Sequence, residues 1–418
     1  MFTKPAKPPA PKSSRKRGGQ PGGRGGGLAL VEHPDRIEHE FPDACGGCGS
    51  PLGRRAEAES VGFTRRQRTD VPPVTAQVTE TRFHTVACDC GARTGAPVPA
   101  EVPDTPTYGP NLKALAVYLV VCQHVPVERA AQLIADLTGA APSTGWIAAQ
   151  LARAAGLVAP ALRLIRALLT LGHVLHADET TTRIRAGRAW LHTACTDKLT
   201  LLALAARSRA GARGLGVLDA FRGTLVHDAL NLYDDFPRAS HQLCVAHVIR
   251  ELTAQHEQHP EQRWADQIRW ALARLIEQAR QARDAGLHHV PPEQAQVYLR
   301  AYHQGIAVGL SLHPRTPARK QSDATNLLER LRDRADQYLR FTRDLHVAPT
   351  NNQGERDLRP VKTQIKISGC HQSETGAANW LAVRSYLSTA AKHGLGAHAT
   401  LRAAMTGELW MPPIAIED

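Results

Sequence analysis

The amino-acid sequence predicts a multidomain α/β protein whose largest domain contains a mixed β-sheet. The chain has 418 residues, which is more than one ordinary hydrophobic core accommodates. Between residues 171 and 248, three consecutive strand-like segments precede a helix-like segment and two further strands. This order of elements is typical of a mixed sheet with helices packed on it. Short strand-like segments near two cysteine pairs predict a separate small β region N-terminal to the domain with the mixed sheet.

Residues 1–30 form a basic N-terminal segment rich in Gly and Pro. Residues 1–27 carry several Lys and Arg side chains and no acid. We expect this segment to be disordered on its own, because it has too little apolar surface to offset the entropy lost on ordering. All charged side chains of residues 1–27 are basic, which favours an arm that lies along DNA, with Arg17 or Arg24 in a groove. A solubilising tail is the alternative interpretation.

Residues 31–104 predict a zinc-ribbon-like DNA-binding region. Strand-like segments at 71–78 and 81–87 alternate Val and Thr with other residues. The chain has eight cysteines and no apolar secretion signal, which favours reduced thiols and metal binding over disulfides. Four thiolates in two close pairs suit a structural, tetrahedral Zn²⁺. The candidate ligands are Cys45, Cys48, Cys88 and Cys90, with His84 as a possible substitute because only one residue separates the second pair.

Residues 105–170, which follow a Pro-rich linker at 96–110, predict a helical region. Pro126 stands at the first turn of one expected helix, and Gly139 and Pro142 interrupt the pattern. Ser143 is a candidate N-cap for a second helix through Arg153. Two short helices joined by a tight turn have helix-turn-helix spacing. An ordinary helical hairpin explains the same text equally well.

Residues 171–400 predict the catalytic domain, followed by a tail at 401–418. A charged segment with a helical pattern, at about residues 250–349, interrupts the domain. We expect its helices to break near the prolines of this segment. Further helices are expected around residue 355 and from about 376 to 393. Five strands are predicted, at residues 173–177, 189–194, 199–205, 223–227 and 242–245, with a helix at about 210–221.

Three carboxylates are the candidate catalytic residues. Asp178 and Asp228 each follow a predicted strand, and Glu355 begins a predicted helix. Carboxylates at the ends of adjacent strands can share one cleft, and hard cations such as Mg²⁺ prefer oxygen ligands. Two such ions about 4 Å apart activate water and stabilise the leaving oxyanion in phosphodiester cleavage. Each acid taken alone is more often a turn or helix cap, and four neighbouring acids compete for the role: Glu179, Asp234, Asp235 and Asp357.

The charge of the chain predicts a polyanionic partner. The net charge is +12 and the pI is about 9.6, which makes nucleic acid the first candidate and an anionic membrane surface the weaker one. We expect no membrane span, because we find no uninterrupted apolar run of roughly 18 residues. Without a signal segment, the expected location is the cytoplasm.

Several motifs of this chain occur in the same order in a known family. They include His-Ala-Asp-Glu-Thr at 176–180, Val-His-Asp-Ala at 226–229, a Cys244-x-x-His247 segment, and Asn-Asn-Gln-Gly-Glu-Arg-Asp-Leu-Arg-Pro at 351–360. On these residues the chain resembles the transposase of the insertion sequence 66 family, the TnpC group. The resemblance implies a ribonuclease-H-like core with a helical insertion and a preceding zinc-binding region. It also implies an Asp-Asp-Glu (DDE) triad that uses Mg²⁺ or Mn²⁺, with Asp178, Asp228 and Glu355 as its members.

The resemblance implies that the protein is an active DNA transposase. Water would cut the ends of the element, and the freed 3′-hydroxyl would attack target DNA. Expected partners are the terminal inverted repeats, target DNA, further copies of the chain on DNA, and accessory proteins of the same element. A catalytically silent repressor and a structure-specific nuclease are the alternatives.

Residues close to the acids have two expected roles. A basic group at Arg356, Arg359, Lys362 and Lys366 would contact DNA phosphates, although a solvated helix face explains it equally well. Cys244 and His247 lack visible partners for a metal site, and we expect them to pack and orient the core near the acids. The other three cysteines read as ordinary buried residues.

Overall fold

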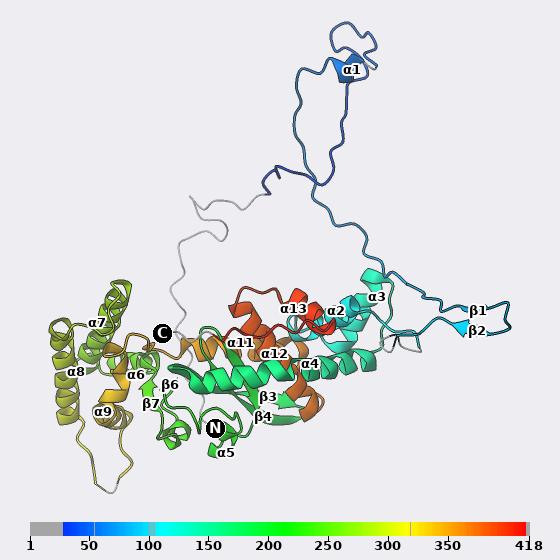
Figure 1. Ribbon diagram of the computed structural model, residues 1–418. Helices are drawn as coiled ribbons and strands as arrows, with labels where there is room; N and C mark the ends of the chain where they lie inside the picture. The colour runs from blue at the N-terminus through cyan, green and yellow to red at the C-terminus, as the bar shows by residue number, and fades with distance from the viewer. Residues whose placement is uncertain (1–27, 54, 100–101, 103–104, 318, 415–418) are drawn as a thin grey trace. The chain divides into compact units, whose positions relative to one another are not determined.

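The computed structural model describes residues 28–53, 55–99, 102, 105–317 and 319–414 (Figure 1). The chain divides into two compact units, Met1–Pro73 and Val74–Asp418. This division falls inside the 31–104 region that the sequence predicts as one piece. The predicted basic arm up to residue 27, with Arg17 and Arg24, lies outside the described residues.

The first unit has little regular structure in its described part. It contains the short helix α1 (Arg55–Ala58) and an isolated antiparallel bridge between Ala44 and Pro51. Most of these residues are exposed, so the unit has little core of its own. The strand predicted at 71–78 does not form. An alternating segment becomes a strand only where another strand pairs with it, and none of the residues that the structure describes forms a strand beside this segment.

The second unit begins with a small hairpin. Its strands are β1 (Thr85–Ala87) and β2 (Arg93–Gly95), which pair antiparallel with Thr85 opposite Gly95. The strand predicted at 81–87 is therefore shorter than expected. The turn of the hairpin contains the Cys88–Cys90 pair.

Three helices follow: α2 (Pro110–Val121), α3 (Val127–Thr138) and α4 (Thr144–Leu171). Ser143 caps α4 as predicted, because its side chain accepts a hydrogen bond of 3.1 Å from the Trp146 backbone. The helix does not end near Arg153 but continues through Pro160 to Leu171. Apolar residues spaced by three and four continue beyond Arg153, and the buried ones join two hydrophobic clusters of the unit.

Helix α4 is long and apolar enough to cross a membrane by length and composition alone. A buried helix of a soluble core passes the same test. In this structure Val158, Ala161, Ile165 and Leu169 are fully buried against other elements, which accounts for the apolar composition of α4.

The central sheet has five strands in the order β5-β4-β3-β6-β7. Strand β3 pairs antiparallel with β4 and parallel with β6, and β7 is also parallel to β6, so the sheet is mixed as predicted. All five predicted strands form: β3 (Val174–Ile184), β4 (Gly187–Cys195), β5 (Thr200–Leu204), β6 (Thr224–His227) and β7 (Ser240–Leu243). The helix predicted at 210–221 is reduced to α5 (Arg209–Arg213); beyond it Leu215, Leu218 and Phe221 are buried without regular structure.

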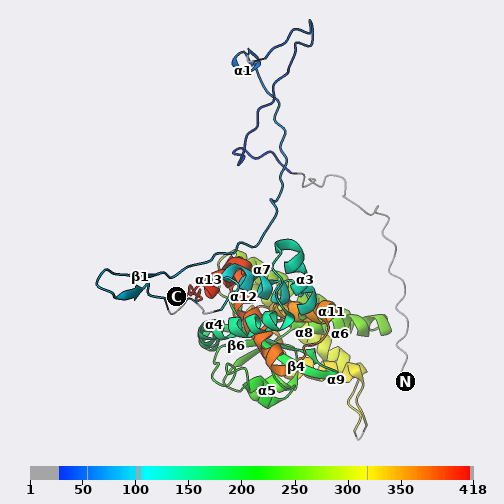
Figure 2. The ribbon, with the colours of Figure 1, turned by 90° about the vertical axis from the view of Figure 1, so that its right-hand side faces the viewer.

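Three C-terminal helices complete the core around the sheet: α11 (Asn352–Ser368), α12 (Glu374–Lys392) and α13 (Ala397–Met405). Helix α11 packs on β3 and β4, and α12 packs on β5 and α4. Figure 1 shows α13 beside α2 and α12, and Figure 2 shows it again beside α12. The boundary predicted at residue 400 falls within α13, whose Leu401 is fully buried, so α13 belongs to this core and not to a tail.

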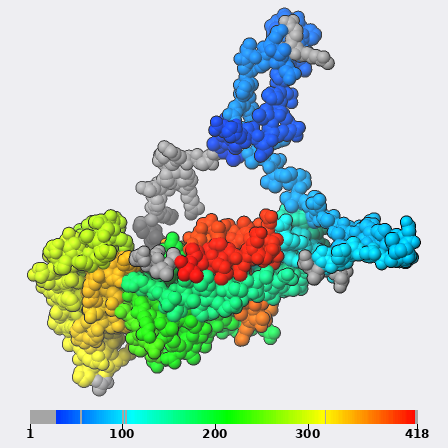
Figure 3. All heavy atoms as spheres, viewed as in Figure 1, coloured from blue at the N-terminus to red at the C-terminus, as the bar shows by residue number. Residues whose placement is uncertain are grey.

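The segment between β7 and α11 is helical, as the sequence predicts. Its helices are α6 (Val245–Gln258), α7 (Trp264–Asp284), α8 (Pro292–Leu312), α9 (Asp323–Asp333) and α10 (Ala335–Tyr338). They share a hydrophobic cluster of their own. Figure 3 shows these yellow and yellow-green residues as a distinct mass beside the green residues of the sheet. Helix α8 starts at the predicted break, with proline in its first turn.

Candidate active site

Asp178 lies in β3, and Asp228 directly follows the neighbouring parallel strand β6. The last registered pair between β3 and β6 joins His176 and Val226, and each aspartate lies two residues beyond it. Asp178 does not follow the strand, as the sequence analysis expected, but lies within β3. That strand continues to Ile184 because β4 pairs with it further than β6 does.

Asp178 belongs to the face of the sheet that α11 covers. Side chains alternate between faces along a strand, so Asp178 shares a face with His176, which contacts α11 through Asn351. Asp228 lies beyond the end of β6, close enough to Asp178 to raise its pKa. Glu179 points to the opposite face, where the Tyr233 hydroxyl donates a hydrogen bond of 3.0 Å to its carboxylate.

The environment of Asp178 disfavours a charged carboxylate. Burial raises its pKa from 3.8 to about 7, and repulsion from Asp228 and Glu179 adds to the effect. A hydrogen bond from the Glu179 backbone (2.8 Å) and the nearby Lys362 act in the opposite direction without cancelling it. Without a cation, this carboxyl is therefore about half protonated near neutral pH.

The acids that compete with Asp178 and Asp228 are held in ion pairs. Glu179 accepts from Arg207 at 3.2 Å, and its side chain is only 4% exposed. Asp234 pairs with Arg334 at 2.5 Å, and Asp235 pairs with Arg209. In contrast, the structure gives neither Asp178 nor Asp228 an ion-pair partner within the described residues. Asp228 only accepts a hydrogen bond from the Leu230 backbone (3.2 Å).

Glu355 stands in the first turn of α11, as predicted. Its Oε1 atom lies 4.0 Å from His247 Nε2 and 3.9 Å from Arg250 Nη2, both on α6, and its side chain is 38% exposed. Two residues later, Asp357 points into the core, where it contacts Lys392 Nζ at 2.6 Å. Of the two acids, only Glu355 has no close partner.

The structure brings two of the three candidate acids together and puts the third on an adjoining helix. Asp178 and Asp228 repel one another electrostatically, and α11, with Glu355, packs on β3. Within the described residues, no three His, Cys, Asp or Glu side chains are close enough to hold one metal ion. The oxygen chemistry of the acids and the raised pKa of Asp178 nevertheless fit a site for a hard divalent cation.

The predicted basic residues of α11 are exposed. Arg356, Arg359, Lys362 and Lys366 make no ion pair within the described part of the chain. Spacing by three and four residues puts the last three on the helical stripe of Glu355. Lys362 is close enough to Asp178 to lower its pKa. Unpaired cations therefore lie beside the candidate acids.

Each cysteine pair occupies a tight turn in its own unit. In the first unit, the Cys45 backbone N–H donates to Ser50 O at 2.9 Å, and Cys48 Sγ lies 3.4 Å from Ser50 Oγ. Hydrogen bonds from Ser50 and Cys45 lower the pKa of Cys48 to about 7. This favours the thiolate form, which binds zinc.

In the second unit, Cys88 and Cys90 lie at the tip of the β1–β2 hairpin. The Cys88 N–H donates to Ala92 O at 2.7 Å, and hydrogen bonds from Cys90 lower the pKa of Cys88. His84, the suggested substitute ligand, precedes the hairpin and is exposed. The donor chemistry of both pairs suits Zn²⁺.

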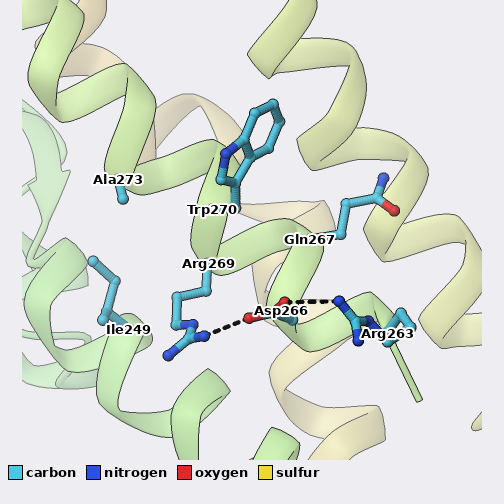
Figure 4. A pocket seen from close by; sticks show the side chains of 7 residues that line it. All are labelled: Ile249, Arg263, Asp266, Gln267, Arg269, Trp270 and Ala273. Atoms are coloured by element: carbon cyan, nitrogen blue, oxygen red, sulfur yellow. Dashed lines mark hydrogen bonds and ion pairs between the residues drawn. The ribbon is translucent and has the colours of Figure 1, made fainter. Parts of the chain in front are cut away.

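The helical insertion contains a pocket of about 640 Å³ away from the acids (Figure 4). Trp270 on α7 is its exposed aromatic residue, packed edge-on against Tyr298 with ring centroids 5.3 Å apart. Asp266 binds both arginines of the pocket, Arg263 at 3.4 Å and Arg269 more closely. Because both guanidinium groups are already paired, little free charge remains there.

Sequence reasoning did not single out Asn351, Gly354 or Arg250. Asn351 is 1% exposed and makes hydrogen bonds to both β3 and Cys244. The only sequence signal for it was its place in the polar run that leads to Glu355. Cys244, expected to orient the core near the acids, accepts a hydrogen bond from Asn351 and directly precedes α6.

Comparisons with known proteins identify two regions of the chain. A family model described as "Transposase IS66 family" matches residues 106–379, and one described as "zinc-finger binding domain of transposase IS66" matches residues 42–91. The first match covers more than half of the chain and includes Asp178, Asp228 and Glu355. The second includes Cys45, Cys48, Cys88 and Cys90. No curated protein sequence matches the chain.

Proposed function

The chain belongs to the IS66 family of transposases, and from this premise we propose that it cuts the DNA ends of an insertion sequence and joins them to target DNA. One observation carries the proposal. Asp178 in β3 lies on the face covered by the helix that bears Glu355, and Asp228, directly after the adjacent parallel strand β6, is close enough to raise the pKa of Asp178. Within the described residues Asp178 and Asp228 have no ion-pair partner and Glu355 has none closer than 3.9 Å, whereas their sequence neighbours form closer ion pairs.

The sheet supports a ribonuclease-H-like core. Three antiparallel strands, β3 to β5, continue into two strands parallel to the first, in the order β5-β4-β3-β6-β7. This topology places β3 beside β6. Asp178 lies in β3, and Asp228 directly follows β6. The helical insertion between β7 and α11 fits the same proposal.

The proposed site would hold Mg²⁺ or Mn²⁺ through Asp178, Asp228 and Glu355. Two such ions, when bound, supply an activated water and stabilise the leaving oxyanion. The chain itself presents Asp178 in a buried position, where its pKa of about 7 leaves it ready to exchange a proton for a cation. Arg250 and His247 lie 3.9 and 4.0 Å from Glu355 and leave its carboxylate open to a metal ion.

The proposed reaction has two balanced steps at one site. Water attacks the phosphorus at the element end, its oxygen joins the phosphate, and the 3′-hydroxyl leaves after accepting a proton. That 3′-hydroxyl then attacks a phosphorus in target DNA, loses its proton, and displaces the 3′-oxygen of the target strand. Neither step consumes a redox cofactor or nucleotide.

DNA would be held by the cations next to the acids. Arg356, Arg359, Lys362 and Lys366 are exposed and unpaired in the described structure, and such side chains position a DNA backbone by its phosphates. Zn²⁺ bound by the cysteine pairs, and the basic arm with Arg17 and Arg24, would add contacts. The partners would be terminal inverted repeats and target DNA in the cytoplasm, with further copies of the chain and accessory proteins.

The test is nicking and strand transfer on a DNA carrying the element end. We expect Asp178→Asn, Asp228→Asn and Glu355→Gln each to reduce Mg²⁺- or Mn²⁺-dependent nicking by on the order of 10³-fold or more. DNA binding should persist in all three. Asp234→Asn is the matched control, because it changes a neighbouring acid that is paired with Arg334, and its activity should remain close to that of the wild type.

The same assay separates the alternatives. Undiminished nicking in the three variants rejects the assignment of the acids. Specific DNA binding by a wild-type chain that never nicks points to a silent repressor, an outcome that the separation of Glu355 from the two aspartates makes worth testing. Nicking without strand transfer points to a structure-specific nuclease.

A further inference from the structure

We infer that Asn351 is the positioning residue of the acidic site: its buried amide ties the helix of Glu355 to the strand of Asp178. The inference rests on the proposed function and deepens it. Asn351 is the residue before α11 and is 1% exposed. Asparagine at this position usually caps its own helix, but the Asn351 side chain makes no capping hydrogen bond. It binds the sheet instead.

The orientation of the Asn351 amide follows from its partners. Asn351 Nδ2 lies 2.9 Å from the Ala177 carbonyl oxygen, which can only accept a hydrogen bond. The amide Oδ1 must therefore accept from His176 Nδ1, 3.0 Å away. Because its partner Oδ1 can only accept, the His176 imidazole carries a proton on Nδ1. The two bonds hold Asn351 against the two residues that precede Asp178.

The backbone of Asn351 connects the other two segments of the site. Its N–H donates to Cys244 Sγ at 3.2 Å, just before α6, and its carbonyl accepts from the Glu355 N–H at 3.1 Å. A second bond, from Val245 N–H to Pro349 O at 2.9 Å, strengthens the same junction. Asn351 therefore contacts the strand of Asp178, the start of α6 and the turn that presents Glu355.

Gly354 leaves room for this arrangement. A Cβ atom at Gly354 would lie 2.9 Å from Asn351 Oδ1, closer than real Cβ atoms approach, and 3.1 Å from Nδ2, which is tighter than most. Because the amide is bonded to His176 and Ala177, it can move away only by breaking those bonds. Gly354→Ala therefore disturbs the amide while leaving every atom of Asn351 in the chain.

The site depends on this tie because Glu355 has no close partner of its own. Its two charged neighbours lie at 3.9 and 4.0 Å, so its position follows that of the first turn of α11. A displacement of about 1 Å at a reacting centre can reduce the rate on the order of 10²-fold. Losing the tie should therefore affect metal binding and chemistry more than it affects the fold.

The experiment compares Asn351→Ala and Gly354→Ala with two control variants of the full chain. Asn352→Ala makes the same change at the exposed neighbour. Ser385→Ala removes a buried hydroxyl that accepts from Leu202 N–H at 2.9 Å and donates to Leu381 O at 2.7 Å, at the α12–β5 contact. The measurements are Mn²⁺ affinity by calorimetry, single-turnover nicking, DNA affinity and the thermal midpoint.

We expect both test variants to weaken Mn²⁺ binding at least 10-fold and to slow nicking about 10²-fold, with unchanged DNA affinity. Ser385→Ala should lower the thermal midpoint yet retain wild-type Mn²⁺ affinity and nicking, and Asn352→Ala should change none of these. The inference is overturned if the test variants behave like Ser385→Ala.

The outcome is separable from failure of the proposed function. If Asp178→Asn abolishes Mn²⁺ binding and nicking while Asn351→Ala and Gly354→Ala do not weaken either, the acidic site stands and the positioning role falls. If Asp178→Asn leaves both unchanged, the proposed site itself is wrong.

Discussion

The two faces of helix α11 carry acids in opposite circumstances. On the buried face, Asp357 contacts Lys392 Nζ at 2.6 Å and the Thr200 hydroxyl at 2.8 Å. On the open face, Glu355 has only distant partners at 3.9 and 4.0 Å. Asp357 thus has close charged and hydrogen-bonding partners, whereas Glu355, two residues earlier, has no charged partner closer than 3.9 Å.

The difference teaches how to tell a structural acid from a candidate metal ligand. A buried charge is tolerated only when it is paired and hydrogen-bonded, and Asp357 meets that condition. Asp178 is substantially buried without an ion-pair partner in the described residues, and its pKa rises to about 7 as a result. An acid that remains in such a position at a cost in stability is a functional candidate.

The largest expected effect is on the buried face. Asp357→Ala leaves Lys392, whose side chain is 14% exposed, without its partner and should lower the free energy of unfolding by about 3–5 kcal/mol. Glu355→Gln should change it by no more than about 0.5 kcal/mol. Urea denaturation measures both. The double variant Asp357→Leu with Lys392→Met should recover most of the lost unfolding free energy. If Glu355→Gln lowered the unfolding free energy as much as Asp357→Ala, the two faces of α11 would not differ as described.

Asp178 should make the metal-free protein less stable as pH rises. Its folded pKa of about 7 lies above the usual 3.8, so the folded state binds more protons between these values and stability falls from pH 4 to pH 7. At about 1.4 kcal/mol per pKa unit, the upper limit is about 4 kcal/mol. Asp178→Asn should remove this decline in denaturation curves taken with EDTA. A parallel decline in wild type and variant would show that Asp178 is not its source.

Lys362 on the open face should act on DNA and not on folding. Lys362→Ala should reduce the slope of log affinity against log salt by about 0.9, as expected for one lost phosphate contact. Its unfolding free energy should stay within about 0.5 kcal/mol of wild type. The control is Lys198→Ala, an exposed lysine after β4, which should leave the salt slope unchanged. An unaltered slope in Lys362→Ala would favour a solvated helix face.

The smallest effect is expected at the pair of Glu355 and Arg250. At 3.9 Å, with side chains 38% and 65% exposed, Arg250→Gln should cost less than about 1 kcal/mol of stability. Chemical denaturation at low and high salt measures it. A loss as large as that of Asp357→Ala would mean that Glu355 is a structural acid after all.

Much of the fold was predictable because local pattern decides local structure. Five strands, the cap at Ser143 and the helical insertion all follow from apolar periodicity and turn residues. The strand predicted at 71–78 failed because a strand needs a partner that alternation cannot supply. The length of α4 and the burial of α13 also escaped prediction, because both depend on packing with elements far away in sequence.

By itself, the sequence determined the candidates: three acids, four cysteines, a basic helix and a chain order that resembles one family. Only the tertiary structure decided which acids have partners. Sequence spacing does not reveal that Asp357 meets Lys392, that Glu179 meets Arg207 on the far face of β3, or that Asn351 bonds to the strand before Asp178. Those contacts join residues far apart in the chain, and their energies depend on burial and distance, which only the folded chain sets.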